Sequence, residues 1–266
     1  MYTPFDFSEA LGHRKDYIED RLREGSPVVG IAYDTGLLLF TIRRTQRKVY
    51  EIYDRHMFSA IGNQSDIENV RLASINMAHQ EGFERSPDDV SLQRMVGFSL
   101  SPALKKGYGD QMTVPFVIRA LFAELGKSSS ADCFFVLNFD GEYRRAADNA
   151  VVAGTPSAED RMLSVIGSPL RDELPLAKAL KLAAEAWAAG ARDAHKRRNI
   201  ASDFDESDQG SPLKGVDEGD ADDVFLRDEL KVGTIEAAVL ERKPAQRTEA
   251  RFRLLSEVEI AEATAK

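Results

Sequence analysis

One stretch near the start, Gly25–Gly62, constrains the fold most, because it holds four short apolar runs separated by turns or charged residues. An Asp-Thr-Gly sequence typical of hairpin turns joins the first two runs. Runs such as LLLFTI are apolar on both strand faces, so both faces of the resulting sheet should be covered. The stretch therefore predicts two hairpins inside a layered structure. Its runs are Pro27–Tyr33, Leu37–Ile42, Val49–Tyr53 and Met57–Ile61.

Length and charge limit the possible classes of protein. The chain has 266 residues, 43% of them hydrophobic, and a formal net charge of −9. We expect a single domain over residues 1–266, since this length can bury one sizeable core. The negative charge argues against a nucleic-acid partner, because no strongly basic region is left to neutralise phosphates. No apolar run approaches the roughly 20 residues that span a bilayer, and the first residues lack signal-peptide features. We therefore predict a cytoplasmic protein with no membrane partner.

The single cysteine and the four histidines give no sign of a metal site. Cys133 lies in the apolar run CFFVL, which favours a buried core thiol over a nucleophile. One cysteine cannot form an internal disulfide, which indicates a reducing compartment. The histidines show no metal-ligand spacing, and no phosphate-binding glycine loop or GxSxG motif is present. We predict no cofactor and no metal, and interpret the histidines as surface or packing residues: His13, His56, His79 and His195.

The N-terminal residues predict a short segment followed by a helix. Residues 1–7 are aromatic, interrupted by proline and too short to fold alone. Ser8 is a suitable N-cap, and we assign residues 8–25 to a helix that ends at Gly25. Its apolar stripe is narrow, which fits a helix laid on a surface, either that of a neighbouring subunit or that of its own domain.

Helices and strands alternate through the rest of the chain. Helix start signals are Ser65 with Glu68, Ser86 with Pro87, Ser157 with Asp160, and Pro175. Pro102 should kink the second of these helices, and Gly190 should end the fourth. A short terminal helix starts from Ser256. Further strands are expected at Phe116–Leu125, Cys133–Phe139, Tyr143–Ala147, Val151–Ala153, Thr234–Leu240 and Ala250–Leu255.

Residues 192–231 differ from the rest in composition. They are rich in Asp, Glu, Gly and Ser, contain few large apolar residues and lack periodicity. Burial could not offset the entropy lost on ordering such a segment, so we predict a disordered acidic insertion. A docking segment for a basic partner is the alternative interpretation.

Strand pairs, two helices, strand pairs, two helices and a last strand pair is the element order of an α+β, four-layer αββα sandwich. Four stretches then carry a resemblance to the α-type subunits of the 20S proteasome, and most to the actinobacterial type. The resemblance covers nearly the whole chain from the first helix onward, except the acidic insertion, and implies the N-terminal nucleophile hydrolase fold. The stretches are GSPVVGIAYDTGLLLF from Gly25, KVYEIYDRHMFSAIG from Lys48, VPFVIRALFAEL from Val114 and VVAGTPSAEDRM from Val151.

The resemblance also implies where a catalytic site would be. In the catalytic β relatives an N-terminal threonine is the nucleophile, and an acid on the second strand holds a lysine that lowers its pKa. The matching positions here are Ser26, Ile42 and Lys48. An isoleucine cannot orient a lysine and Ser26 is internal, so we predict that this chain is not an enzyme. Threonine-type endopeptidase activity would belong to β partners. The alternative is a self-processed peptidase or amidohydrolase with Ser26 as its N-terminal nucleophile.

Lys48 would then have a docking role. In α subunits the lysine at this position lies in a pocket between neighbouring subunits and receives the C-terminal carboxylate of an activator's tail. An ammonium pairs well with a carboxylate at a partly desolvated rim. Gly62 is a candidate for the same pocket. Without the family resemblance, a solvated lysine close after several arginines is the simpler interpretation.

Two further sites are implied by the resemblance. An N-terminal gate near the ring axis would contain Tyr2, Phe5 and Asp6, although they depart from the Tyr-Asp-Arg gate motif of archaeal and eukaryotic relatives. An entrance annulus, or pore loop, would contain Tyr108, Gly109 and Asp110. A locally packed Tyr108 is the alternative to the second site.

The predicted function is a non-catalytic α-type subunit of a 20S proteasome core particle. Copies would form a heptameric ring that gates substrate entry and docks an ATP-dependent unfoldase or other activator for protein degradation. The implied partners are other α subunits, β subunits, the activator and protein substrates. A divergent relative that assembles only with itself is a further alternative.

Overall fold

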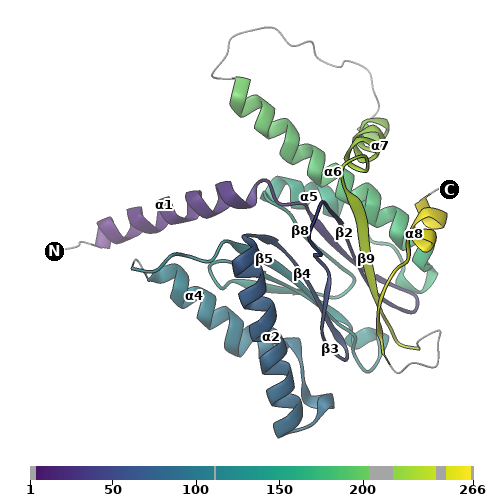
Figure 1. The fold of residues 1–266 in the computed structure, drawn as a ribbon, viewed down its shortest axis with the longest axis horizontal. Coiled ribbons are helices and arrows are strands. Elements are labelled where there is room, and N and C mark those ends of the chain that lie inside the picture. The colour runs from purple at the N-terminus through teal and green to yellow at the C-terminus, as the bar shows by residue number, and fades with distance from the viewer. Residues whose placement is uncertain (1–3, 111, 204–217, 244–249, 265–266) are drawn as a thin grey trace.

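The computed structural model describes residues 4–110, 112–203, 218–243 and 250–264 (Figure 1). Two antiparallel five-stranded sheets lie at its centre, with helices on either side (Figure 1). This arrangement confirms the α+β class. Within the described ranges, no helix is long and apolar enough to cross a membrane.

The first sheet has the strand order β10-β9-β2-β1-β8, and the second has the order β3-β4-β5-β6-β7. All the strands expected from the sequence are present, with ends within two residues of those predicted. The first sheet comprises β1 (Val28–Tyr33), β2 (Gly36–Arg43), β8 (Asn149–Val152), β9 (Thr234–Glu241) and β10 (Phe252–Leu254). The second comprises β3 (Tyr50–Tyr53), β4 (His56–Gly62), β5 (Ile118–Glu124), β6 (Cys133–Asn138) and β7 (Tyr143–Ala146).

The two opening hairpins belong to different sheets. Strands β1 and β2 pair in the first sheet, from Val28↔Thr41 to Tyr33↔Gly36, whereas β3 and β4 pair in the second. The chain must therefore cross from one sheet to the other between Arg43 and Tyr50. This crossing segment, residues 44–49, carries Lys48.

Three hydrophobic clusters lie between the layers of helices and sheets. One packs the inner faces of the two sheets together and includes Leu37, Leu39 and Phe134. Another joins Leu38 and Phe40, on the opposite face of β2, to helices α5 (Pro156–Ile166), α6 (Leu176–Asp203) and α8 (Glu257–Thr264). The third packs the second sheet against α2 (Gln64–Glu84), α3 (Leu92–Arg94), the π-helix η2 (Met95–Leu100) and α4 (Ser101–Gly109). Both faces of β2 are buried, as expected from a run that is apolar on both strand faces.

The N-terminal helix α1 (Pro4–Leu22) begins before its predicted start. Ser8 lies inside the helix rather than at its N-cap, because Pro4 can occupy the first turn, where its missing N–H has no intrahelical partner to lose. Residues 4–7 of the expected gate segment are therefore helical, and residues 1–3 lie outside the described ranges. In Figure 1, α1 extends sideways from the body of the molecule.

Three helix starts differ from the predicted ones. Asn63 rather than Ser65 is the N-cap of α2, and Thr155 rather than Ser157 caps α5 by accepting a hydrogen bond from the Ala158 N–H. Ser86 does accept from the Asp88 N–H, but it starts only the short 3₁₀ turn η1 (Pro87–Asp89). The π-helix η2 then leads into α4 just before Pro102, whose ring removes a backbone hydrogen bond and favours such an irregular turn.

Helix α6 does not stop at Gly190 but continues to Asp203. A side chain at Gly190 would begin only 2.4 Å from the Met162 sulfur, so this glycine permits close packing of α5 on α6 rather than ending a helix. A further helix, α7 (Glu218–Glu229), lies beside α6 (Figure 1). The prediction of disorder is wrong for residues 192–203 and 218–229, and residues 204–217 lie outside the described ranges.

Helix α7 is ordered by contacts that its composition does not reveal. Asp222 forms ion pairs with Arg161 and Arg192, which come from α5 and α6. Phe225 and Leu226 pack against the cluster between the first sheet and its helices. These few apolar side chains and one shared carboxylate are enough to hold α7 on the body of the protein.

Two 3₁₀ turns and a terminal helix are the remaining helical elements of the described residues. The 3₁₀ turns η3 (Ser129–Ala131) and η4 (Arg171–Glu173) lie in connecting loops. The terminal helix α8 follows Ser256, as predicted, and has a reciprocal cap. The Ser256 hydroxyl accepts from the Glu259 N–H, while the Glu259 carboxylate accepts from the Ser256 N–H.

Candidate functional site

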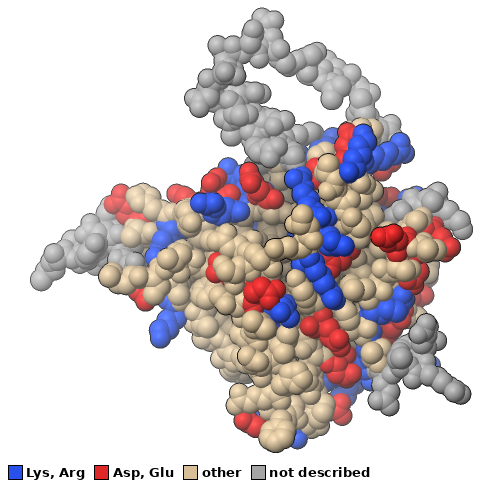
Figure 2. Space-filling view, in the orientation of Figure 1, with Lys and Arg blue, Asp and Glu red and all other residues tan. Residues whose placement is uncertain are grey.

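A cavity of about 1040 Å³ opens where α1 ends and the chain crosses between the two sheets. We call it the Lys48 cavity. Its walls come from the end of α1, the residues before β1, the end of β2, the crossing segment, the end of β4, the start of α2, and helices α6 and α7. In Figure 2, Lys and Arg form a band down the middle of the face in view, over the region in which Figure 1 labels β2.

Three residues that the sequence analysis predicted as counterparts of a catalytic frame lie together in this cavity: Ser26, Ile42 and Lys48. The Ser26 hydroxyl donates a hydrogen bond of 2.6 Å to the Ile42 carbonyl. The indole N–H of Trp187 donates to Ser26 Oγ at 3.3 Å and to the Pro27 carbonyl at 3.0 Å. The hydroxyl proton is therefore engaged by a carbonyl that cannot take it up as a base, and Ser26 has a structural role in this arrangement.

The Ile42 side chain is part of the packing around β2. It belongs to the cluster between the first sheet and its helices, and a side chain on Gly233 would begin 2.7 Å from its Cγ2 atom. The position for which the resemblance predicted an acid in catalytic relatives is thus apolar and closely packed here.

The Lys48 ammonium is buried in the cavity wall with a backbone carbonyl as its hydrogen-bond partner. Its Nζ donates a hydrogen bond of 2.6 Å to the Ser26 carbonyl, and no carboxylate of the described residues lies within ion-pair distance. Burial lowers the pKa of Lys48 to about 8, although the Glu236 carboxylate acts in the opposite direction. The ammonium is therefore desolvated and only partly compensated.

Glu236 lies close to Lys48 but binds its backbone rather than its side chain. The buried carboxylate on β9 accepts from the Lys48 N–H at 2.9 Å and from the Val49 N–H at 3.1 Å. Arg43 and Arg47 approach the same carboxylate to 3.5 and 3.7 Å. Glu236 thus fixes the crossing segment in place and leaves the ammonium facing the cavity without a carboxylate of its own.

Cations outnumber acids along the cavity walls. The lining cations are Arg21, Arg23, Arg43, Arg44, Arg47 and Lys48, and the lining acids are Asp20, Glu24 and Glu229. Some are paired, since Arg23 approaches Asp20 and Arg44 approaches Glu229 to 3.5 Å. The surplus of positive charge should attract an anionic group into the cavity.

Gly62 also lines the Lys48 cavity, at the end of β4. It has a φ of +133°, and a side chain there would begin 2.0 Å from the Val117 carbonyl oxygen. Only glycine fits this close approach of two backbone segments. Gly62 therefore lets β4 end close to the Val117 backbone at the cavity wall.

The other predicted site residues do not join the cavity. Tyr108 and Gly109 form the last turn of α4, and Asp110 follows as its C-cap. The Tyr108 hydroxyl donates to the Leu11 carbonyl of α1 at 3.2 Å, and its ring packs on Phe139 at 5.6 Å between centroids. Of the three gate residues, Phe5 and Asp6 fall in the first turn of α1 with side chains outside the described set, as is all of Tyr2.

The residues that the sequence did not assign to a site include Trp187, Phe225 and Glu229, which line the cavity, and Glu236, which binds the backbone of the crossing segment. Glu236 had a usable signal, because it is an acid inside the otherwise apolar strand sequence IEAAVL. Trp187 lies in the alanine-rich sequence AAEAWAAG, where an aromatic residue indicates core packing and no particular partner. Phe225 and Glu229 lie on α7, in the segment whose composition indicated disorder.

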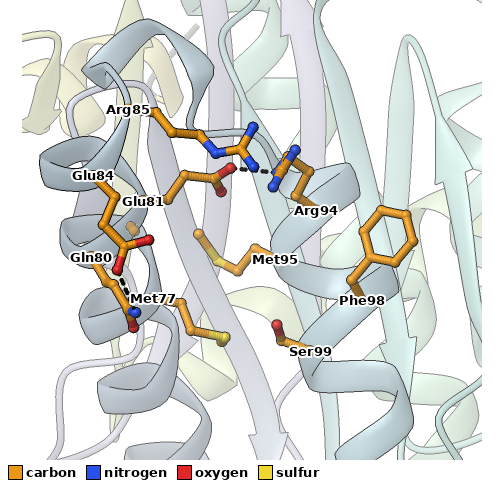
Figure 3. A pocket seen from close by; sticks show the side chains of 10 residues that line it. Met77, Gln80, Glu81, Glu84, Arg85, Arg94, Met95, Phe98 and Ser99 are labelled. Atoms are coloured by element: carbon orange, nitrogen blue, oxygen red, sulfur yellow. Dashed lines mark hydrogen bonds and ion pairs between the residues drawn. The ribbon is translucent and has the colours of Figure 1, made fainter.

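A second hollow, of about 460 Å³, lies between α2 and η2 on the other side of the molecule's sheets (Figure 3). Met77 and Met95 are among its apolar lining residues. Glu81 forms an ion pair with Arg94, and Gln80 donates to Glu84 at 2.8 Å (Figure 3). Among the described residues, no cluster of three or more His, Cys, Asp or Glu could hold a metal ion.

Comparisons with known proteins agree on one family name. No family model matches the chain. It is 30% identical over 187 residues to the proteasome subunit alpha of Actinosynnema mirum, which covers 68% of each chain. It is 30% identical to the proteasome subunit alpha of Streptosporangium roseum, covering 69% of this chain and 71% of the relative. For that of Kineococcus radiotolerans the identity is also 30%, covering 70% and 78%.

Proposed function

Because this chain belongs to the family of proteasome alpha subunits, we propose that its Lys48 cavity receives the C-terminal carboxylate of a partner protein's tail. One observation carries this proposal: the Lys48 ammonium is desolvated, faces a cavity and has no carboxylate within ion-pair distance among the described residues. A carboxylate that enters supplies the missing counter-charge. Arginines along the walls would draw it in.

The assembly in this proposal is a 20S core particle in the cytoplasm. Copies of the chain form a heptameric ring on β subunits, and the ring gates the entry of protein substrates and docks an ATP-dependent unfoldase or other activator. We also propose that the fold is the four-layer αββα sandwich. The support is that one hydrophobic cluster lies between the two sheets and one lies between each sheet and its helices. Residues 1–7 and Tyr108–Asp110 stay our candidates for the gate and the pore loop.

Peptide-bond cleavage is assigned to the β partners and not to this chain. Ile42 stands where an acid would be needed, and the Ser26 hydroxyl donates to a carbonyl. The self-processed hydrolase would also require cleavage between Gly25 and Ser26. Gly25 is packed there, because a side chain on it would begin 2.8 Å from the Ile61 Cβ atom.

The proposal is tested by substituting Lys48 in the assembled particle. Lys48→Ala should leave the ring intact and remove stimulation of peptide hydrolysis by a tail-bearing activator. Loss of a charge-assisted hydrogen bond in a desolvated site corresponds to about 2–3 kcal/mol, or roughly 30–150-fold in tail affinity. The exposed Lys127, with 74% of its side chain accessible, provides the matched control Lys127→Ala.

A second measurement separates carboxylate recognition from general charge attraction. A synthetic tail peptide with a free C-terminus should bind the particle, whereas the same peptide with a C-terminal amide should not. Equal binding of the two peptides, or full stimulation of Lys48→Ala, would contradict the proposal.

A further inference from the structure

Lys48 has the properties of a reactive amine. For a lysine with a pKa of about 8, about a quarter of the amines are neutral at pH 7.5. An ordinary lysine with a pKa of about 10.4 has roughly one neutral amine in a thousand at that pH. Only the neutral amine has a lone pair that can attack an electrophile. Lys48 is therefore far better populated in its nucleophilic form than a typical surface lysine.

The hydrogen bond to Ser26 does not block this reactivity. Nζ donates one hydrogen to the Ser26 carbonyl at 2.6 Å. A neutral amine keeps a second hydrogen and a lone pair, and neither is needed for that bond. Since no carboxylate of the described residues is within ion-pair distance of Nζ, no such partner has to be displaced before it reacts.

The cavity walls indicate the kind of electrophile that would reach Lys48. Arg43 at the end of β2 and Arg47 in the crossing segment share Glu236 and are 36% and 44% exposed, and Arg44, which pairs with Glu229, is 67% exposed. Guanidinium groups hold phosphate oxygens through charge-assisted, bidentate hydrogen bonds. A cavity of about 1040 Å³ readily admits a small reagent. These features favour a small acyl donor that carries a phosphate.

We propose that Lys48 is a site of acylation by small acyl phosphates, and that this modification closes the cavity to carboxylate tails. The second half of this statement rests on the proposed docking function. In the reaction, the Nζ lone pair attacks the acyl carbon and a C–N bond forms. The C–O bond to phosphate breaks, phosphate leaves with the electron pair, and the surplus proton of Nζ passes to the released phosphate. With acetyl phosphate the products are Nζ-acetyl-lysine and hydrogen phosphate.

The modified residue would fit the same surroundings. An acylated Nζ retains one N–H, which can still donate to the Ser26 carbonyl, so the local backbone keeps its partner. The positive charge is lost, and the acyl group projects into the cavity. A tail carboxylate would then meet a neutral amide in place of an ammonium.

Acylation rates measured on the purified full-length protein test whether Lys48 is the preferred site of acylation. The protein is incubated with acetyl phosphate at pH 7.5, and modification of each lysine is followed by peptide mass spectrometry. Lys48 should react at least tenfold faster than the exposed control Lys127, and its rate should rise with pH to a plateau with a midpoint near pH 8. A Lys48 rate equal to or below that of Lys127 would overturn the proposal.

The class of donor is tested with a neutral reagent and an arginine variant. Arg44→Gln should slow the reaction of Lys48 with acetyl phosphate severalfold, while its reaction with the N-hydroxysuccinimide ester of acetate stays unchanged. An equal effect on both reagents would show that the cavity walls do not select a phosphate, and would overturn the assignment to acyl phosphates.

Tail binding separates this inference from the proposed function. Protein acylated at Lys48 should lose binding of the free-carboxylate tail peptide, and Lys48→Gln should behave in the same way. If Lys48 is acylated selectively but the tail still binds, the docking function fails while the reactive amine stands. If Lys48→Ala abolishes tail binding but Lys48 does not react selectively, the docking function stands and acylation fails.

Discussion

The Lys48 cavity and the hollow between α2 and η2 differ in how their charges are compensated. In the hollow, Glu81 is paired with Arg94 and Glu84 with Gln80, all within this chain. At the Lys48 cavity, the Glu236 carboxylate is bound to two backbone N–H groups, and the Lys48 ammonium donates to a backbone carbonyl and has no carboxylate of the described residues within ion-pair distance. Both regions are amphipathic and concave. The difference is that Glu81 and Glu84 in the hollow have partners within the chain, whereas the Lys48 ammonium in the cavity has no carboxylate partner among the described residues.

This comparison shows why charge alone does not identify a site. Ion pairs at a surface change the stability of the folded protein little, and their neutralised charges attract a ligand only weakly. A desolvated charge without a partner lowers the stability of the folded protein, so its retention points to a ligand that completes it. Three predictions test whether this contrast between the two regions is real, in order of decreasing expected effect.

The largest effect is expected for Glu236→Ala. The substitution removes the acceptor of the Lys48 and Val49 N–H groups and leaves Arg43 and Arg47 without their shared carboxylate. Each buried N–H without an acceptor costs about 1–3 kcal/mol, so the free energy of unfolding should fall by about 3–5 kcal/mol. Urea denaturation measures this change.

The control for Glu236→Ala comes from the hollow between α2 and η2. Glu84 accepts a hydrogen bond from Gln80 on the exposed surface of α2, so Glu84→Ala should change the free energy of unfolding by less than about 0.5 kcal/mol. Equal effects of the two substitutions would remove the distinction between the two regions.

The second prediction is a gain in stability that depends on pH. Lys48→Met removes a desolvated charge and should stabilise the protein by about 1 kcal/mol at pH 7. The folded pKa of Lys48, about 8, lies below the ordinary value of 10.5, so the unfolded chain binds more protons between these values. The unmodified protein therefore gains stability as pH rises above 8, by on the order of 2 kcal/mol at pH 9.5.

The difference between Lys48→Met and the unmodified protein should consequently change sign between pH 7 and pH 9.5. Arg94→Met, in the hollow, breaks the ion pair with Glu81 and should destabilise the protein by about 1 kcal/mol at both pH values. Urea denaturation of the three proteins at the two pH values measures these differences. A pH-independent difference for Lys48→Met would mean that the ammonium is solvated in the folded protein.

Much of the fold was predictable because it depends on local patterns. The apolar runs between Gly25 and Gly62 specify strands whatever packs on them, and the turns between them contain suitable residues. Gly190 and helix α7 were mispredicted because their structure depends on distant partners. Gly190 packs against Met162, and Asp222 of α7 is held by arginines from two other helices.

The candidate site also has a part that the sequence predicted and a part that only the structure shows. Ser26, Ile42 and Lys48 were found through sequence stretches that resemble the family, and the structure places them in one cavity. The contacts that determine their chemistry join residues far apart in the chain: Glu236 is 188 residues from Lys48, and Trp187 is 161 from Ser26. No local pattern specifies which strand will bring an acid beside a given lysine. The desolvated state of Lys48 therefore became evident only in the folded structure.

The smallest predicted effect concerns tail binding itself and tests the ammonium most directly. A carboxylate binds the protonated Lys48, and protonation is nearly complete at pH 7 but falls to about a tenth at pH 9 for a pKa of about 8. The affinity of the assembled particle for a free-carboxylate tail peptide should therefore fall about tenfold, or about 1.4 kcal/mol, between these pH values. Titration of a labelled tail peptide by fluorescence anisotropy measures this change in affinity.

The control is Lys48→Arg, which should bind the peptide equally at both pH values, because a guanidinium stays charged throughout. A tenfold loss in this variant as well would place the titrating group elsewhere, and pH-independent binding to the unmodified particle would show that the Lys48 charge is not what the tail recognises.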